Sequence, residues 1–150
     1  ERRMSYVEDG ELDAIILAYA GLVRGGYGDR ATEVFAPEVF MPAPAQGALA
    51  VECRSDDAVA REAIDKLVDA AATAESTAER AVLARLEAGC TAPVAASAVF
   101  DRAGVTLRAG VFALDGSRQL VEEAQGADPA ELGRKVAEVL LERGAADVIE

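Results

Sequence analysis

Hydrophobic residues recur at helical spacing in two stretches of the C-terminal half of the chain. The first stretch follows Ser76-Thr-Ala-Glu79, which has capping-box spacing, and carries an apolar stripe through Val82 and Leu86. The second opens with Asp128-Pro-Ala-Glu131, where an aspartate can cap, a proline takes the first helical position and a glutamate follows. Gly144 ends this stretch, so the pattern predicts one helix near 77–88 and another from 129 onward.

Between these two helices, apolar and polar residues alternate as they do in strands. The runs 93–100 and 105–114 are the first two candidates, and 119–124 is the third. Asp115-Gly116 lies between the last two and is a strong hairpin signal. We therefore expect a small α+β domain, a three-stranded antiparallel sheet with helices on one face.

The first 70 residues predict an α/β arrangement. Asp13-Ala-Ile-Ile-Leu17 is a buried-strand signal and leads directly into a helical pattern over 18–24. The stretch 48–54 alternates as a strand does, which makes Cys53 a candidate core residue. A helix capped by Asp56 or Asp57 is expected to follow.

Composition narrows the classes of function. Apolar residues make up 51% of the chain, which is enough for a core, while the net charge of −12 disfavours nucleic acids and anionic membranes as partners. The chain has no histidine, and its two cysteines are too far apart in sequence to suggest a zinc site or a disulfide scaffold. No apolar run approaches the ~20 residues of a membrane span. These features suit a reducing cytoplasm.

Cys90 is the residue whose type and place in the sequence most clearly indicate covalent chemistry. It follows Gly89, where a helical pattern stops and a strand pattern begins, so the turn can present its thiol outward. A free cysteine is most often a small buried hydrophobe, and that interpretation stands beside the chemical one. An independent thiol enzyme is a further alternative, although no histidine is present to activate the nucleophile.

Four stretches, taken in order, resemble the C-terminal half of the porphobilinogen deaminase (hydroxymethylbilane synthase) family. They are Gly10–Arg24 with its Ala-Tyr-Ala-Gly-Leu-Val-Arg core, Pro42–Arg54, Thr77–Cys90, and the hairpin-and-helix tail. The resemblance covers essentially the whole chain. One departure concerns a turn, because the family usually has glycine where Ala45 stands.

The resemblance implies a transferase of tetrapyrrole (heme) biosynthesis. Members of the family join four porphobilinogen units into hydroxymethylbilane and release ammonia. The product grows on a dipyrromethane cofactor, itself two porphobilinogen units, which a cysteine holds through a thioether. The matching cysteine here is Cys90.

The resemblance also implies a set of cofactor-binding residues. Every pyrrole unit carries acetate and propionate groups, and arginine binds carboxylates through two hydrogen bonds while staying ionised. The positions that match the family's cleft are Arg3, Arg24, Ala18 and Gly21.

By the same resemblance, residues 1–43 would end a second domain, 44–69 would return to a first domain, and 70–150 would form a C-terminal cofactor-attachment domain. Gln46 and Arg54 match the return segment, with a less direct role expected. The first two domains are periplasmic-binding-protein-like α/β lobes in this family.

The family's N-terminal half, which carries its catalytic aspartate, has no counterpart in the sequence. We therefore assign no catalytic residue here and expect the chain alone to be inactive. The expected partners are that N-terminal half, porphobilinogen and its oligomers, in a family that is usually monomeric. The alternative function is a non-catalytic ligand-binding or interaction module derived from the same fold.

Overall fold

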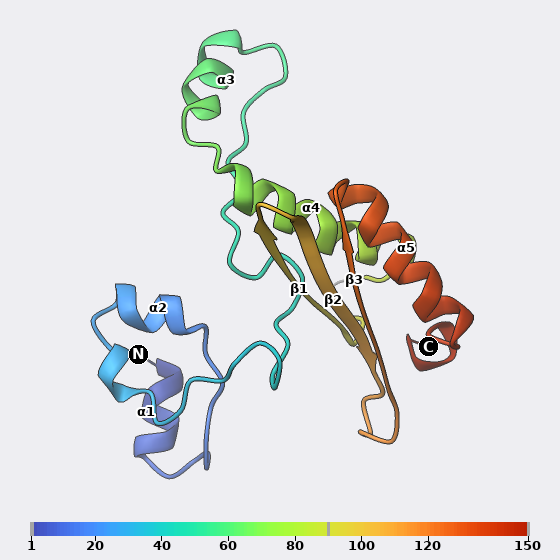
Figure 1. Ribbon diagram of the computed structural model, residues 1–150. Coiled ribbons are helices and arrows are strands. Elements are labelled where there is room, and N and C mark those ends of the chain that lie inside the picture. The colour runs from blue at the N-terminus through green and yellow to red at the C-terminus, as the bar shows by residue number, and fades with distance from the viewer. Residues whose placement is uncertain (1, 90, 150) are drawn as a thin grey trace. The chain divides into compact units, whose positions relative to one another are not determined.

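The computed structural model describes residues 2–89 and 91–149 (Figure 1). Contacts within the chain divide it into two compact units, Glu1–Phe35 and Ala36–Glu150.

The first unit consists of short helices: α1 (Arg2–Glu8), α2 (Tyr19–Arg24) and the 3-10 helix η1 (Gly28–Arg30). The helix expected within 18–24 is confirmed, and Gly25 follows it as the C-cap. The strand expected at 13–17 is absent. A strand needs a neighbour to pair its amide and carbonyl groups, and no described residue supplies one for this stretch.

The second unit begins with a long irregular stretch and the helix α3 (Ala58–Asp65). Asp57 caps this helix by accepting a 2.9 Å hydrogen bond from the Ala60 amide, as the sequence predicted. The strand expected at 48–54 is absent, and Leu49 is 82% exposed. The prediction that Cys53 belongs to the core is wrong, because this stretch has no partner strand among the described residues and Cys53 is exposed.

The rest of the second unit is the predicted α+β domain. Its elements are α4 (Ala70–Arg85), β1 (Val94–Asp101), β2 (Gly104–Phe112), β3 (Gln119–Gly126), α5 (Pro129–Glu142) and α6 (Ala146–Ile149). The strands pair antiparallel in the order β1-β2-β3. This confirms the expected three-stranded antiparallel sheet.

Helix α4 begins earlier than the sequence pattern predicted. Asp69 caps it by accepting a 2.8 Å hydrogen bond from the Ala72 amide. Ser76 lies inside the helix, where its hydroxyl donates to the Thr73 carbonyl. The predicted capping box at 76–79 is therefore wrong, and Glu79 is free for another contact.

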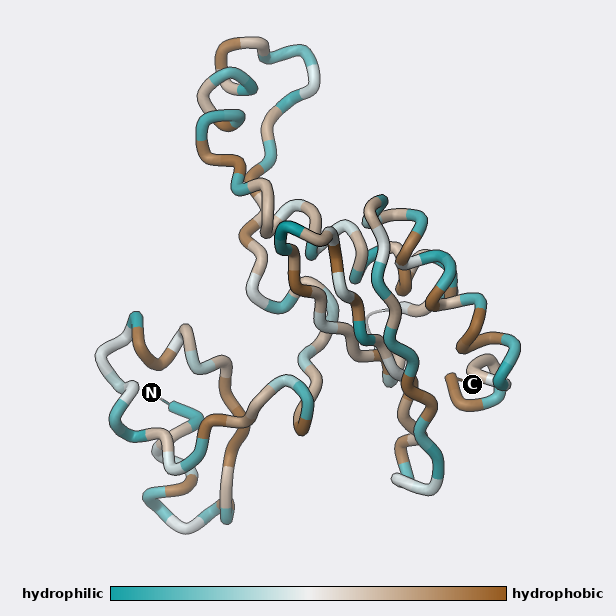
Figure 2. The backbone as a smooth tube through the Cα atoms, in the orientation of Figure 1, coloured by the Kyte–Doolittle hydropathy of each residue, from teal (hydrophilic) through white to brown (hydrophobic). Residues whose placement is uncertain are grey.

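One face of the sheet carries the core. Alternate residues of β2 point to this face, and they are the fully buried Val105, Leu107, Ala109 and Val111. They pack with residues of α4 and α5, which cover the same face of the sheet (Figures 1 and 2). The two helices approach closely at Gly133, where an added Cβ would lie 2.3 Å from the Ala78 carbonyl oxygen.

Candidate functional site

The residues on both sides of Cys90 in the sequence are anchored in the C-terminal domain. Helix α4 ends at Arg85, and Leu86 follows as a buried C-cap. Glu87 then takes a left-handed conformation with φ of 52°, and the Ala88 amide donates to the Leu83 carbonyl at 3.1 Å. Strand β1 starts at Val94. Cys90 itself lies outside the described residues, so its predicted role stays a prediction.

The four other predicted cofactor-binding residues lie in the first unit. Arg3 is on α1 and Arg24 is the last residue of α2, and both are exposed. Neither guanidinium makes a hydrogen bond or ion pair within the described part of the chain. Ala18 is the N-cap of α2, and a Cβ added at Gly21 would meet nothing within 4 Å.

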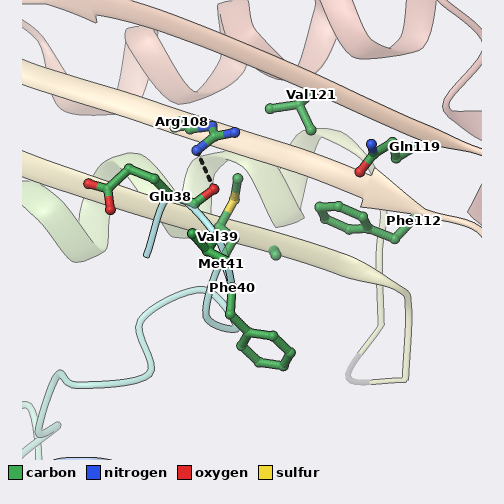
Figure 3. A pocket seen from close by; sticks show the side chains of 9 residues that line it. Glu38, Val39, Phe40, Met41, Arg108, Phe112, Gln119 and Val121 are labelled. Atoms are coloured by element: carbon green, nitrogen blue, oxygen red, sulfur yellow. Dashed lines mark hydrogen bonds between the residues drawn. The ribbon is translucent and has the colours of Figure 1, made fainter. Parts of the chain in front are cut away.

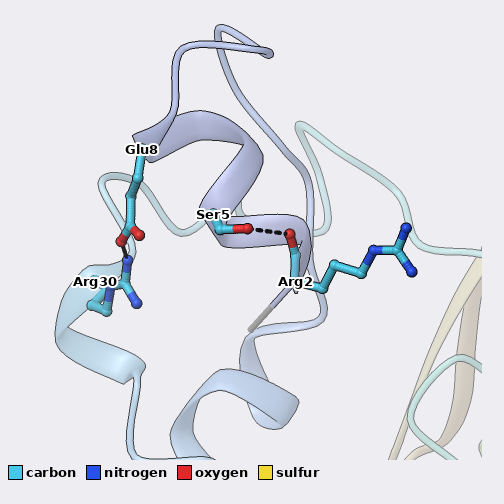
Figure 4. A network of polar contacts seen from close by, with 4 residues as sticks. All are labelled: Arg2, Ser5, Glu8 and Arg30. Atoms are coloured by element: carbon cyan, nitrogen blue, oxygen red, sulfur yellow. Dashed lines mark hydrogen bonds and ion pairs between the residues drawn. The ribbon is translucent and has the colours of Figure 1, made fainter.

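Two neighbouring arginines of the same unit already have partners, and Figure 4 shows the pair that Arg30 forms with Glu8. Arg30 forms an ion pair with Glu8, and its guanidinium carbon lies 5.8 Å from the centre of the Tyr27 ring. The Arg2 Nε donates to the Tyr6 hydroxyl at 2.9 Å. These contacts give Arg2 and Arg30 structural roles and distinguish them from Arg3 and Arg24.

The return segment around Gln46 forms a turn, as expected. The Gln46 amide donates to the Ala43 carbonyl at 3.1 Å, and the Gln46 side chain is exposed. Ala45 has a φ of 58°, which is a left-handed conformation. The Arg54 side chain is 84% exposed and lies 4.0 Å from an Asp57 oxygen, so it is nearly free.

A hollow of about 380 Å³ lies between residues 38–41 and the sheet face opposite the core (Figure 3). Its walls are largely apolar and include Phe40, Met41, Phe112 and Val121. The Arg108 Nη1 donates to the Glu38 carbonyl across it at 2.9 Å. Residues 38–41 therefore contact the sheet beside this hollow. No pattern in the sequence predicted the hollow.

Glu79, which the sequence pattern placed in a capping box, is a buried carboxylate. Its residue is 9% exposed, and its two oxygens accept hydrogen bonds from the Ala45 and Ala98 amides. Burial raises the pKa of the Glu79 carboxyl above its ordinary value, although the two amide donors lower it. Because the spacing of Ser76 and Glu79 fits a capping box, the sequence did not predict that Glu79 accepts from these two amides.

Two negative findings concern only the described residues. No three of their His, Cys, Asp and Glu side chains come together as a set that could hold a metal ion. None of their helices is both long and apolar enough to cross a bilayer.

Two family models match the chain in succession. Residues 1–62 match the model described as "Porphobilinogen deaminase, dipyromethane cofactor binding domain". Residues 73–142 match the model described as "Porphobilinogen deaminase, C-terminal domain". Cys90 and its turn fall in the second range, whereas the four cofactor-binding candidates of the first unit fall in the first.

Curated proteins give the same result. The chain is 60% identical to porphobilinogen deaminase of Corynebacterium aurimucosum, over 99% of the chain and 51% of that protein. It is 44% identical to porphobilinogen deaminase of Deinococcus radiodurans, over the whole chain and 49% of that protein. The chain belongs to the porphobilinogen deaminase family, and it spans about half the length of these relatives.

Proposed function

We propose that this chain is the C-terminal portion of a hydroxymethylbilane synthase. The whole enzyme would join four porphobilinogen units into hydroxymethylbilane, with release of ammonia, in tetrapyrrole biosynthesis in the cytoplasm. The observation that carries the proposal is the ordered match of two family models to nearly all of the chain.

The chain would hold a dipyrromethane cofactor through Cys90. The thiolate sulfur would bond to the methylene carbon of a pyrrole unit after its amino group leaves as ammonia. The bound cofactor would supply the pyrrole end on which the product grows. The flanking elements support this role, because helix α4 ends at Arg85 and strand β1 begins at Val94, on either side of Cys90 in the sequence.

Arg3 and Arg24 would bind the acetate and propionate groups of the cofactor and of the growing product. Their exposed guanidiniums have no partner among the described residues, and the open space over Gly21 leaves room for a ligand beside α2. Ala18 would present backbone at the same place. Both arginines lie in the range matched by the model described as cofactor-binding.

The domain arrangement follows from the same proposal. Residues 1–43 would end the second domain, 44–69 would complete the first, and 70–150 would form the domain that carries Cys90. The strand-like stretches 13–17 and 48–54 support this arrangement, because both expose large apolar side chains and lack partner strands among the described residues. In the whole protein they would complete periplasmic-binding-protein-like lobes.

No residue of this chain is proposed as the catalytic acid or base. That role would fall to the N-terminal half of the enzyme, which would be the partner of this chain. The chain alone would therefore not turn over porphobilinogen.

The proposal is tested by turnover of porphobilinogen by the complete enzyme. Hydroxymethylbilane should accumulate with the unmodified enzyme and with Cys53→Ser, and it should be lost with Cys90→Ser. Cys53 is the matched control because it is the other cysteine and is exposed. Normal turnover by Cys90→Ser, or by the chain without its N-terminal half, would contradict the proposal.

A further inference from the structure

Strand β1 forms one edge of the sheet, and the outward amides of its middle are all paired. The Ala96 amide donates to the Pro42 carbonyl at 3.1 Å. The Ala98 amide donates to Glu79 Oε1 at 2.7 Å, and the Phe100 amide donates to Glu75 Oε1 at 2.9 Å. An edge strand with free amides invites pairing with another chain, so these acceptors protect the edge.

The two carboxylates match the edge because of the geometry of helices and strands. Glu75 and Glu79 are one helical turn apart on α4, which corresponds to a rise of about 6 Å. Ala98 and Phe100 are alternate residues of β1, about 6.7 Å apart along the strand. A helix running antiparallel to the strand can therefore place one carboxylate at each outward amide.

Glu79 makes one contact more than Glu75. Its second oxygen, Oε2, accepts a hydrogen bond of 2.5 Å from the Ala45 amide. Residues 42–45, which we call the strap, are thus held at two points: the Pro42 carbonyl accepts from the Ala96 amide of β1, and the Ala45 amide donates to Glu79 of α4. One buried carboxylate joins the strap, α4 and β1.

The surroundings of this carboxylate are nearly uncharged. The strap, Pro42-Ala-Pro-Ala45, has no ionisable side chain, and β1 faces Glu79 with the amide of Ala98. Glu75, one turn away on α4, raises the pKa of Glu79 further by its negative charge. Backbone amides, rather than a cation, hold Glu79 within the described residues.

We propose that Glu79 is a clasp that fastens the strap to the edge of the C-terminal sheet. Because the carboxylate belongs to α4, the clasp fixes the strap relative to the helix that leads to the Cys90 turn. Glu75 protects the edge without holding the strap. The inference goes beyond the proposed function and rests on these contacts alone.

Site-resolved amide hydrogen exchange, measured on the complete protein, tests the clasp. In Glu79→Gln, one amide loses an acceptor and faces an NH₂ group, so exchange at Ala45 or Ala98, or at both, should rise about tenfold. Exchange at Leu107, in the core of β2, should not change. The matched control, Glu75→Gln, should affect Phe100 and leave Ala45 unchanged. Exchange at Ala45 and Ala98 that is the same in Glu79→Gln as in the unmodified protein would overturn the proposal, and so would faster exchange at Ala45 in Glu75→Gln.

A second measurement needs no substitution and decides the matter if Glu79→Gln unfolds the domain. An NMR pH titration of the unmodified protein follows the Glu79 carboxyl carbon together with the Ala45 and Ala98 amides. The clasp predicts one shared midpoint for all three signals. An Ala45 amide that does not titrate with Glu79 would overturn the proposal.

Discussion

Ala45 takes a backbone conformation that glycine adopts more easily. Its φ of 58° is left-handed, where the Cβ of an L-residue costs roughly 1–2 kcal/mol. The turn keeps this conformation while its amide bonds to Glu79, which suggests that the clasp helps to maintain it. The resemblance implies glycine at this position, and glycine would adopt this conformation without that cost.

We predict that Ala45→Gly stabilises the protein by about 1 kcal/mol, because the relief of the Cβ contact exceeds the added freedom of the unfolded chain. Chemical denaturation would measure the change. Ala48→Gly is the control: Ala48 is exposed and outside the left-handed region, so this change should be neutral or destabilising. A destabilised Ala45→Gly would contradict the account of this turn.

Glu79 should make stability depend on pH with a defined sign. Burial raises the pKa of this carboxyl above 4.5, so the folded protein holds the proton more tightly than the unfolded chain. The contribution of Glu79 is therefore fully present below pH 4.5 and decreases as pH rises through the folded pKa. We expect the stability lost in Glu79→Gln to be largest in acid. Denaturation curves across this pH range would measure it, and a loss that grows with pH would disprove it.

Arg24 should act on binding more than on the chemical step. Its guanidinium is exposed and unpaired among the described residues. Arg24→Gln therefore removes a group proposed to bind a substrate carboxylate, without breaking an internal contact. We predict a rise of about tenfold in KM for porphobilinogen in the complete enzyme. Arg2→Gln should have little effect, because Arg2 already bonds to Tyr6. Equal effects of the two substitutions would argue against the assignment.

At the scale of elements, the close approach of α4 and α5 depends on Gly133. An added Cβ would lie 2.3 Å from the Ala78 carbonyl oxygen and 2.6 Å from the Ala81 Cβ. Alanine favours a helix over glycine by about 1 kcal/mol, but overpacking here costs about 1–3 kcal/mol or more because backbone must move.

Gly133→Ala should therefore lower the thermal midpoint of the C-terminal domain. Gly47→Ala is the control, since a Cβ at Gly47 meets nothing within 4 Å. A Gly133→Ala protein as stable as the unmodified one would show that the helices can separate without cost.

The sequence predicted the elements whose signals and partners lie within this chain, including α2, the Asp57-capped α3 and the strands of the C-terminal sheet. The turn at Asp115-Gly116 and the cap at Asp128 depend on contacts within a few residues. The two strands that flank the turn, β2 and β3, pair with each other within this chain. The stretches 13–17 and 48–54 have strand patterns, but a strand also requires a neighbour, and the described residues offer none.

The site was predictable to a different degree at each residue. Cys90 and the arginines came from resemblance to a family, because an exposed arginine carries no local signal of its own. Glu79 was misread, because the spacing of Ser76 and Glu79 fits a capping box while Asp69 caps the helix seven residues earlier. Only the contacts across α4, β1 and the strap reveal its role.

At the scale of the whole molecule, the proposed cofactor-binding residues come from two parts of the chain. The range matched by the cofactor-binding model carries the open arginines, and the range matched by the C-terminal model carries Cys90. The proposed anchor and the proposed carboxylate ligands therefore come from different units. The central claim is the covalent attachment of a dipyrromethane cofactor to Cys90.

The intact mass of the complete, freshly made protein tests that claim most directly. The account predicts an added mass of two pyrrole units, retained in Cys53→Ser and absent in Cys90→Ser. An unmodified Cys90 in the complete protein, or an adduct that persists in Cys90→Ser, would contradict it. The first of these results would favour a non-catalytic module built on the same fold.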